Sequence, residues 1–273
     1  MRRILLALLF AIPFAVPLSA ATVDGLSINS RSAGSGPTII FVHGWTCDLS
    51  SWDQQVPVFS KKYHVVTLDL PGHGKSQLPN DGKLSMDLFA RAVEAVRVEN
   101  KADKIVLVGH SMGAPVIRQY AHLYPTHVAG LVAVDGPLDM RDFPPPTFSA
   151  PPNLAGAEGL KTRETMIRGM FVPTTSPAIQ DHVMKMMMGA PEATASGAMA
   201  AMFDPALRWK NPIKAPSMEV VAGTGRVPDL QKTREVLPGF EASQLAGTGH
   251  FVMLEKPAEF NQRLTAFLDK IRF

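Results

Sequence analysis

The chain has 273 residues, of which 46% are hydrophobic and 19% are charged. This is the composition of a globular protein that is long enough to bury a substantial core, and it excludes a disordered chain. The formal net charge is +3 and falls to +1 without Arg2 and Arg3, and no basic cluster stands out, which argues against a nucleic-acid partner.

Residues 1–21 have the features of a secretory signal peptide. The two arginines are followed by an apolar stretch at 4–16 that is short for a bilayer span and is interrupted by proline, and residues 19–21 fit a small-residue cleavage site. We therefore expect a mature protein that starts near Thr22, is secreted or periplasmic, and keeps no stable membrane span. An uncleaved anchor is the alternative, and the lack of a basic stop-transfer flank disfavours it.

Buried strands alternate with amphipathic helices along residues 22–136. Residues 23–36 suggest a hairpin or edge strands, and continuous apolar runs predict strands at 38–42, 64–70, 105–109 and 128–134. Segments 51–62 and 84–96 have helical spacing, as does the segment after Gly113. This order predicts a mostly parallel, doubly wound sheet with helices on both faces, an α/β fold whose site lies at the carboxyl ends of the strands.

The run at 105–109 ends in Gly109-His110-Ser111-Met112-Gly113, the Gly-x-Ser-x-Gly pattern of a nucleophile elbow. The serine must adopt a strained backbone conformation between a strand and a helix, and side chains at the two glycines would collide. The helix that follows directs free N–H groups at the site, where they can stabilise an oxyanion.

Asp69 and Cys47 lie near the ends of two other predicted strands. The glycine-rich turn at 71–76 is not a phosphate loop, because Asp69 stands where the first glycine of that motif is required. We interpret Asp69 as a structural residue that fastens its turn. Cys47 is the only cysteine, so no intrachain disulfide forms, and we interpret it as a pocket-wall residue rather than a nucleophile.

The composition of the chain changes at Pro137. Residues 137–210 contain proline-rich runs, three predicted helices at 158–171, 177–189 and 191–203, and a concentration of methionines. We interpret this segment as a helical cap inserted into a core formed by residues 22–136 and 211–273. The methionines either form an adaptable apolar lining, with Met184 and Met188 as candidate pocket residues, or simply pack the cap onto the core. Strands at 217–223 and 241–246 and a helix at 257–271 complete the core.

With these motifs in order, the chain closely resembles the α/β-hydrolase superfamily, in particular its capped esterase and haloperoxidase-like members. Four motifs carry the resemblance: Phe41-Val42-His43-Gly44-Trp45, Asp69-Leu70-Pro71-Gly72-His73-Gly74-Lys75-Ser76, the serine elbow, and Gly247-Thr248-Gly249-His250-Phe251. The resemblance implies Ser111 as nucleophile and His250 as general base. It also implies an oxyanion hole formed by the backbone N–H groups of Trp45 and Met112.

The acid of the triad is where the family pattern breaks. Most relatives carry an aspartate in a Gly-x-x-Asp turn after the strand at 217–223, but this chain has Arg226 there. Asp135, at the end of the strand after the nucleophile helix, and Asp229, three residues past Arg226, are the two candidates. We favour Asp135, because a residue at a strand end holds the imidazole with less freedom.

These residues lead us to expect a secreted serine hydrolase that cleaves carboxylic esters of apolar, uncharged small molecules through an acyl-enzyme, without metal or cofactor. Further candidate pocket residues are His43, His110 and Phe251, although the two histidines also fit a structural role at the turns. A lactonase, a C–C bond hydrolase or a perhydrolase on the same triad is an alternative. A non-catalytic ligand-binding protein on the same fold is another, because fold does not fix function.

Overall fold

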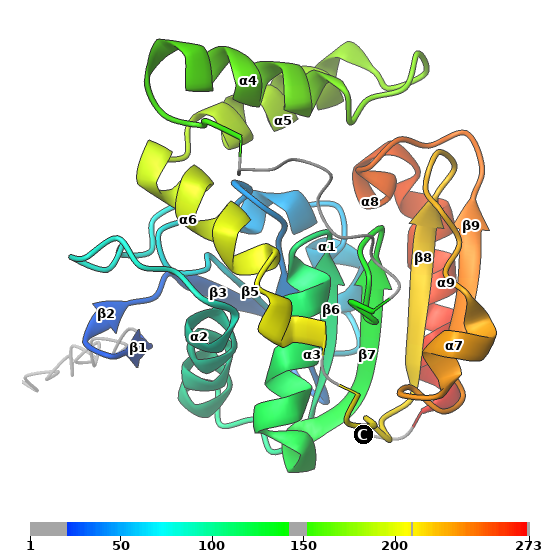
Figure 1. Cartoon of the computed structure of the whole chain (residues 1–273). Helices are drawn as coiled ribbons and strands as arrows, with labels where there is room; N and C mark the ends of the chain where they lie inside the picture. The colour runs from blue at the N-terminus through cyan, green and yellow to red at the C-terminus, as the bar shows by residue number, and fades with distance from the viewer. Residues whose placement is uncertain (1–20, 142–151, 209, 272–273) are drawn as a thin grey trace, which may run out of the picture.

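A seven-stranded sheet forms the centre of the protein (Figure 1). The computed structural model describes residues 21–141, 152–208 and 210–271, so the predicted signal peptide lies outside the described residues except for Ala21. The strand order is β3-β5-β4-β6-β7-β8-β9, and only β3 is antiparallel to its neighbour. The strands are β3 (Ser30–Ala33), β4 (Thr38–Val42), β5 (His64–Leu68), β6 (Ile105–His110), β7 (Val128–Val134), β8 (Ser217–Ala222) and β9 (Glu241–Leu245). The mostly parallel α/β sheet predicted from the sequence is confirmed.

The register of the central strands brings their carboxyl ends to one edge. Val42, the last residue of β4, pairs with both Leu68 of β5 and Gly109 of β6, and His110 pairs with Val134 of β7. Every residue of β4 and β6 is buried, because helices cover both faces of a parallel sheet and leave no solvent-facing positions. The loops that leave this edge therefore meet above the sheet.

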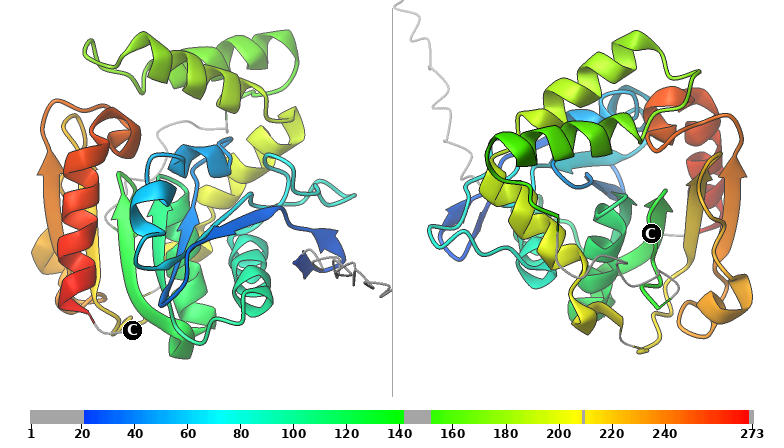
Figure 2. Two further views of the ribbon diagram at one scale, coloured as in Figure 1. Left: turned by 180° about the vertical axis from the view of Figure 1, so that it is seen from behind. Right: turned by 45° about the horizontal axis from the view of Figure 1, so that its top comes forward.

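Helices α2 and α3 cover one face of the sheet, and α1 and α9 cover the other (Figures 1 and 2). The helices of the core are η1 (Leu49–Trp52), α1 (Val56–Phe59), α2 (Met86–Glu99), α3 (Gly113–Leu123), η2 (Pro125–His127), α7 (Leu230–Arg234), α8 (Val252–Glu255) and α9 (Pro257–Lys270). A small hairpin of β1 (Thr22–Val23) and β2 (Leu26–Ser27) precedes the edge strand β3, so the N-terminal region contains both a hairpin and an edge strand.

The helix predicted over residues 51–62 is instead two short pieces, η1 and α1. The Asp48 side chain accepts the Ser50 N–H and starts the tight turn of η1. Pro57 then lies in the first turn of α1, the place in a helix where its missing N–H is not needed. These two residues each begin a helix, so the segment forms two.

Between β7 and β8 the chain forms α4 (Gly156–Arg168), α5 (Pro177–Met188), α6 (Glu192–Met202) and η3 (Pro205–Arg208). Helices α4 and α5 pack against each other beyond the carboxyl edge of the sheet (Figure 1). Arg163 of α4 is buried, and its Nη2 donates to the carbonyls of Met187 and Ala190, both at 2.8 Å, which ties α4 to the end of α5. Residues 142–151 and 209 of the predicted cap lie outside the described residues. In the described ranges, no helix has the length and apolar character that a bilayer span needs.

Candidate active site

Ser111 lies in the turn between β6 and α3 with a left-handed backbone angle, φ 51°. Its N–H donates to the Val134 carbonyl at 2.9 Å, so the neighbouring strand fixes the turn. A Cβ at Gly109 would lie 2.3 Å from the Gly113 carbonyl oxygen, and a Cβ at Gly113 would lie 2.5 Å from the Val42 carbonyl oxygen. Only glycine fits at either position, because strand and helix backbones nearly touch there.

Asp135 follows β7 and contacts His250. His250 Nδ1 donates to Asp135 Oδ2 at 2.6 Å, and the Ala222 N–H of β8 donates to Asp135 Oδ1 at 2.8 Å. The aspartate has φ 44°, and its own N–H donates to the Val220 carbonyl at 2.9 Å. Burial alone would raise the pKa of Asp135, but the hydrogen bond and charge of His250 and the Ala222 N–H together lower it. Asp135 is therefore an ionised carboxylate held against the imidazole.

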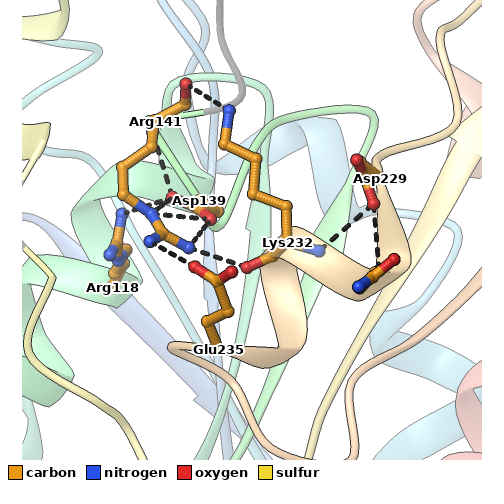
Figure 3. Close-up of polar contacts among 7 residues, drawn as sticks. Arg118, Asp139, Arg141, Asp229, Lys232 and Glu235 are labelled. Carbon is orange, nitrogen blue, oxygen red and sulfur yellow. Dashed lines mark hydrogen bonds and ion pairs between the residues drawn. The ribbon is translucent and has the colours of Figure 1, made fainter.

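Asp229 has a different task. It precedes α7, and its Oδ1 accepts the N–H groups of Gln231 at 3.0 Å and Lys232 at 3.1 Å, which is the geometry of a helix N-cap (Figure 3). Gly225, in the turn where relatives were expected to carry the acid, has no room for a side chain, because a Cβ there would lie 2.6 Å from Asp135 Oδ1. Of the two candidate acids, the structure brings Asp135 to His250.

The backbone around His250 is held from two sides. Its N–H donates to the Met170 carbonyl after α4 at 3.0 Å, and its carbonyl lies 2.9 Å from His110 Nε2. The preceding Gly249 N–H donates to Glu255 Oε2 at 2.9 Å. Sequence reasoning missed Met170 and Glu255, because neither belongs to a motif and only the packing of α4 and α8 reveals them. In the described part of the chain no hydrogen bond joins the Ser111 hydroxyl to the His250 ring; such contacts often tighten only when substrate binds.

The loop after β4 lies against the serine elbow. A Cβ at Gly44 would lie 3.1 Å from Ser111 Cβ, so the backbone of the next residue, Trp45, passes beside the nucleophile. Within the described residues, neither the Trp45 N–H nor the Met112 N–H donates a hydrogen bond. An oxyanion hole needs N–H groups that are not already donating to the protein, and both predicted donors meet that condition. The Trp45 indole Nε1 donates instead to the Ala195 carbonyl of α6 at 2.8 Å.

His43 and His110 are fully buried and hold the turns. His43 Nε2 accepts the Leu70 N–H at 3.0 Å, which leaves Nδ1 protonated to donate to the Gly44 carbonyl at 2.8 Å. Burial lowers the pKa of His43, and burial together with the charge of His250 lowers the pKa of His110 to about 3. Both rings are neutral near pH 7, so they fit the structural role more than an acid-base role.

Asp69 fastens its turn in the way expected from the sequence. Its Oδ1 accepts the Leu49 N–H at 2.8 Å, and its Oδ2 accepts the Lys75 N–H at 2.9 Å and the Asn29 side-chain amide at 2.7 Å. These bonds join the loops after β4 and β5. Cys47 is buried, and burial raises the pKa of its thiol to about 12, which makes it a poor nucleophile.

Two cavities adjoin these loops. One, of about 390 Å³, is lined by both Asp135 and His250. The other, of about 480 Å³, lies between α5 and the loop after β4, and the methionine that lines it is Met186. Met184 and Met188 are half-buried and pack against the core, and Phe251 is fully buried with its ring 5.0 Å from that of His110. Contact of these predicted pocket residues with substrate stays a prediction. The described residues contain no group of three or more metal-ligating side chains.

Comparison with known proteins finds relatives that share this fold. The family model of the α/β hydrolase fold matches residues 37–165. A Haemophilus influenzae protein provisionally named an esterase/lipase is 26% identical over 246 residues, which cover 86% of this chain and 84% of the relative. A thermophilic esterase from Thermogutta terrifontis shares the fold with a TM-score of 0.76 at 21% identity, over 92% of this chain and 96% of that chain. The enol-lactonase of Burkholderia xenovorans LB400 gives a TM-score of 0.77 at 19% identity, over 90% and 98% of the two chains. The family match over residues 37–165 and the fold shared with these solved structures show that this chain has the α/β-hydrolase fold.

Proposed function

We propose that this α/β-hydrolase cleaves carboxylic esters as a serine hydrolase, with Ser111, His250 and Asp135 as its triad. The observation that carries the proposal is the 2.6 Å hydrogen bond from His250 Nδ1 to Asp135 Oδ2, together with the φ of 51° that Ser111 adopts in the turn between β6 and α3. An aspartate at Nδ1 fixes the ring tautomer, so that Nε2 presents its lone pair as a base.

The reaction follows from the chemistry of these groups. A serine hydroxyl is a weak nucleophile at neutral pH, so His250 Nε2 takes its proton as Ser111 Oγ attacks the ester carbonyl carbon. The negative charge that forms on the carbonyl oxygen accepts hydrogen bonds from the Trp45 and Met112 N–H groups. The imidazolium, stabilised by the Asp135 carboxylate, then protonates the leaving alcohol. Water, activated by His250 in the same way, releases the acid from the acyl-enzyme.

The substrate class rests on the helices beyond the carboxyl edge. Met184 and Met188 of α5 are adaptable apolar side chains, and we infer that they favour uncharged, apolar acyl or alcohol groups. The provisional name of the Haemophilus influenzae relative and the name of the Thermogutta terrifontis enzyme support an esterase. The similarity to an enol-lactonase supports a second candidate, since a lactone is a cyclic ester and opens by the same steps. Export to the periplasm or medium is proposed on residues 1–21 alone.

The test compares the wild-type protein from Thr22 onward with Ser111→Ala on p-nitrophenyl esters from acetate to dodecanoate. We expect turnover by the wild type, a loss of at least about four orders of magnitude in kcat for Ser111→Ala, and fluorophosphonate labelling at Ser111 only. Ser85→Ala is the matched control, because the Ser85 hydroxyl caps α2 by accepting the Leu88 N–H, and we expect its loss to cost stability but not activity. Labelling with lactone turnover but no ester turnover would favour the lactonase. A chain that neither turns over any ester or lactone nor takes the label is not a serine hydrolase.

A further inference from the structure

The segment that carries Asp135 is anchored a few residues further on by a buried carboxylate. Leu138, Asp139 and Met140 are all buried. The Asp139 carboxylate accepts the Arg141 N–H at 3.0 Å and holds the Arg141 guanidinium through Nε at 3.0 Å and Nη2 at 2.7 Å (Figure 3). This bidentate pairing closes the chain into a tight turn between residues 139 and 141.

The same carboxylate faces the nucleophile helix. Arg118 lies on α3, the helix that begins two residues after Ser111, and its Nη1 lies 3.7 Å from Asp139 Oδ1, with both side chains only 2% exposed. Burial lowers the pKa of Arg118 to about 10, while the Asp139 charge acts in the opposite direction, so the guanidinium keeps its charge at neutral pH. The ion pair therefore links the acid's segment to α3.

The Arg141 guanidinium reaches a third element. Its Nη2 donates to the Lys232 carbonyl of α7 at 2.7 Å, its Nη1 pairs with Glu235 at 3.0 Å, and Lys232 Nζ donates to the Arg141 carbonyl at 3.1 Å (Figure 3). Helix α7 is the one that Asp229 caps, after β8. The turn at 139–141 is thus bonded both to the nucleophile helix and to the helix that follows the Asp135-contacting strand.

We propose that Asp139 and Arg141 are positioning residues that hold the Asp135 carboxylate against His250, with Arg118 and Lys232 as their anchors. The inference rests on the proposed triad. In the chain, the turn at 139–141 lies between Asp135 and helices α4–α6. Because the turn is fixed to α3 and α7, it holds the proposed acid independently of those helices. A displacement of about 1 Å at a reacting group can cost about a hundredfold in rate.

The test uses Asp139→Asn, which leaves the side-chain size unchanged but removes the charge that holds both guanidinium groups. We expect kcat on the best ester to fall about a hundredfold, with KM nearly unchanged, because the acid and not the substrate is displaced. The downfield ¹H NMR signal of the His250 Nδ1 proton, which reports its bond to Asp135, should broaden or move. Arg141→Lys, a milder change that keeps the charge but loses the bidentate contact, should show both effects to a smaller degree.

Glu94→Gln is the matched control for a purely structural effect. Glu94 also holds α3 through a half-buried network, with Arg97 at 2.7 Å and the Tyr120 hydroxyl at 2.7 Å, but this network ties α3 to α2, and none of its members contacts Asp135. We expect it to lower the melting temperature and leave the His250 proton signal in place. If Asp139→Asn and Arg141→Lys lower the melting temperature like the control while keeping kcat and the signal, the positioning role is wrong. The signal does not depend on ester turnover, so a wild type inactive on esters would overturn the proposed function and still leave this inference measurable.

Discussion

At the residue scale, the assignment of the acid separates two aspartates, Asp135 after β7 and Asp229 before α7. Asp135→Asn keeps the shape of the side chain but lets His250 adopt the wrong tautomer, so we expect kcat to fall about ten-thousandfold. Asp229→Asn should leave kcat within about twofold, because asparagine caps a helix as well as aspartate does. Ester turnover of the two variants, measured side by side, checks both values. The larger loss in Asp229→Asn would reverse the assignment.

Ser111 and His250 could be predicted from local sequence motifs, whereas the acid could not be assigned from a motif. The serine elbow and the histidine loop are local patterns, set by a few neighbouring residues. The choice between Asp135 and Asp229 depends on how β7 pairs with β8: the Asp135 N–H meets the Val220 carbonyl, and its carboxylate meets the Ala222 N–H. Such a contact joins residues more than eighty positions apart, and the sequence around neither residue indicates that the two meet.

Gly225 packs directly against Asp135, in the turn where the family pattern expects an aspartate. A Cβ at this position would lie 2.6 Å from Asp135 Oδ1 and 2.7 Å from Val221 Cγ1. The Asp135 carboxylate thus occupies the space that a side chain at position 225 would need, one residue before Arg226. The backbone of the turn after β8 therefore packs closely around Asp135.

At the scale of elements, Trp45 joins the oxyanion loop to α6. Its backbone N–H is the proposed oxyanion donor, while its indole bonds the Ala195 carbonyl at 2.8 Å. Trp45→Phe removes the indole bond to the Ala195 carbonyl, at a cost of about 0.5–1.5 kcal/mol. We expect kcat to change by less than about tenfold, because the backbone donor remains. Amide hydrogen exchange in α6 should become faster.

Amide hydrogen exchange and kcat, measured together on Trp45→Phe, show whether the indole holds α6 or acts on the substrate. A fall in kcat by several hundredfold without faster exchange in α6 would mean that the side chain acts on the substrate rather than on the helix. Unchanged exchange with unchanged kcat would mean that the indole bond does not hold α6. Trp52→Phe is a useful comparison, because that indole is also buried and packs on Phe41 at 4.9 Å, away from α6.

Element boundaries were predicted best where one periodic pattern ran without interruption. The helix α2 and the strands β4 to β7 lie where their apolar spacing indicated, because burial of one helix face or of both strand faces fixes that spacing. The segment at 51–62 has the same spacing, but it begins inside η1 and Pro57 lies in the first turn of α1, so it contributes to two short helices. Helix α8 is only four residues long and carries no period to detect.

At the scale of the whole molecule, the segment that contains α4–α6 is bonded to two loops of the proposed site. The Met170 carbonyl accepts the His250 N–H, the Ala195 carbonyl accepts the Trp45 indole, and the Thr194 hydroxyl donates to the Gly72 carbonyl at 2.6 Å in a buried contact. The first two bonds place the proposed base and oxyanion loop in direct contact with α4–α6. Movement of those helices is therefore coupled to the geometry of the site.

The buried histidines make the stability of the whole fold sensitive to acid. Burial lowers the pKa of His73 to about 3, with the charge of His43 adding to the effect, and the pKa of His110 is also lowered to about 3. In the unfolded chain both side chains titrate near pH 6.5. Between these values the unfolded state binds more protons, so the stability present above pH 6.5 is lost as the pH falls toward 3.

From pH 7 to pH 5 we expect these two residues to lower the free energy of unfolding by about 4 kcal/mol, about 2 kcal/mol each. Urea unfolding at the two pH values measures this difference directly. His73→Asn, in which the side-chain amide replaces the Nδ1 donor to the Pro71 carbonyl, should remove about half of it. Equal loss in the variant and the wild type would mean that the native state protonates His73 without unfolding, and its neutral, buried ring would then not be a source of the acid sensitivity.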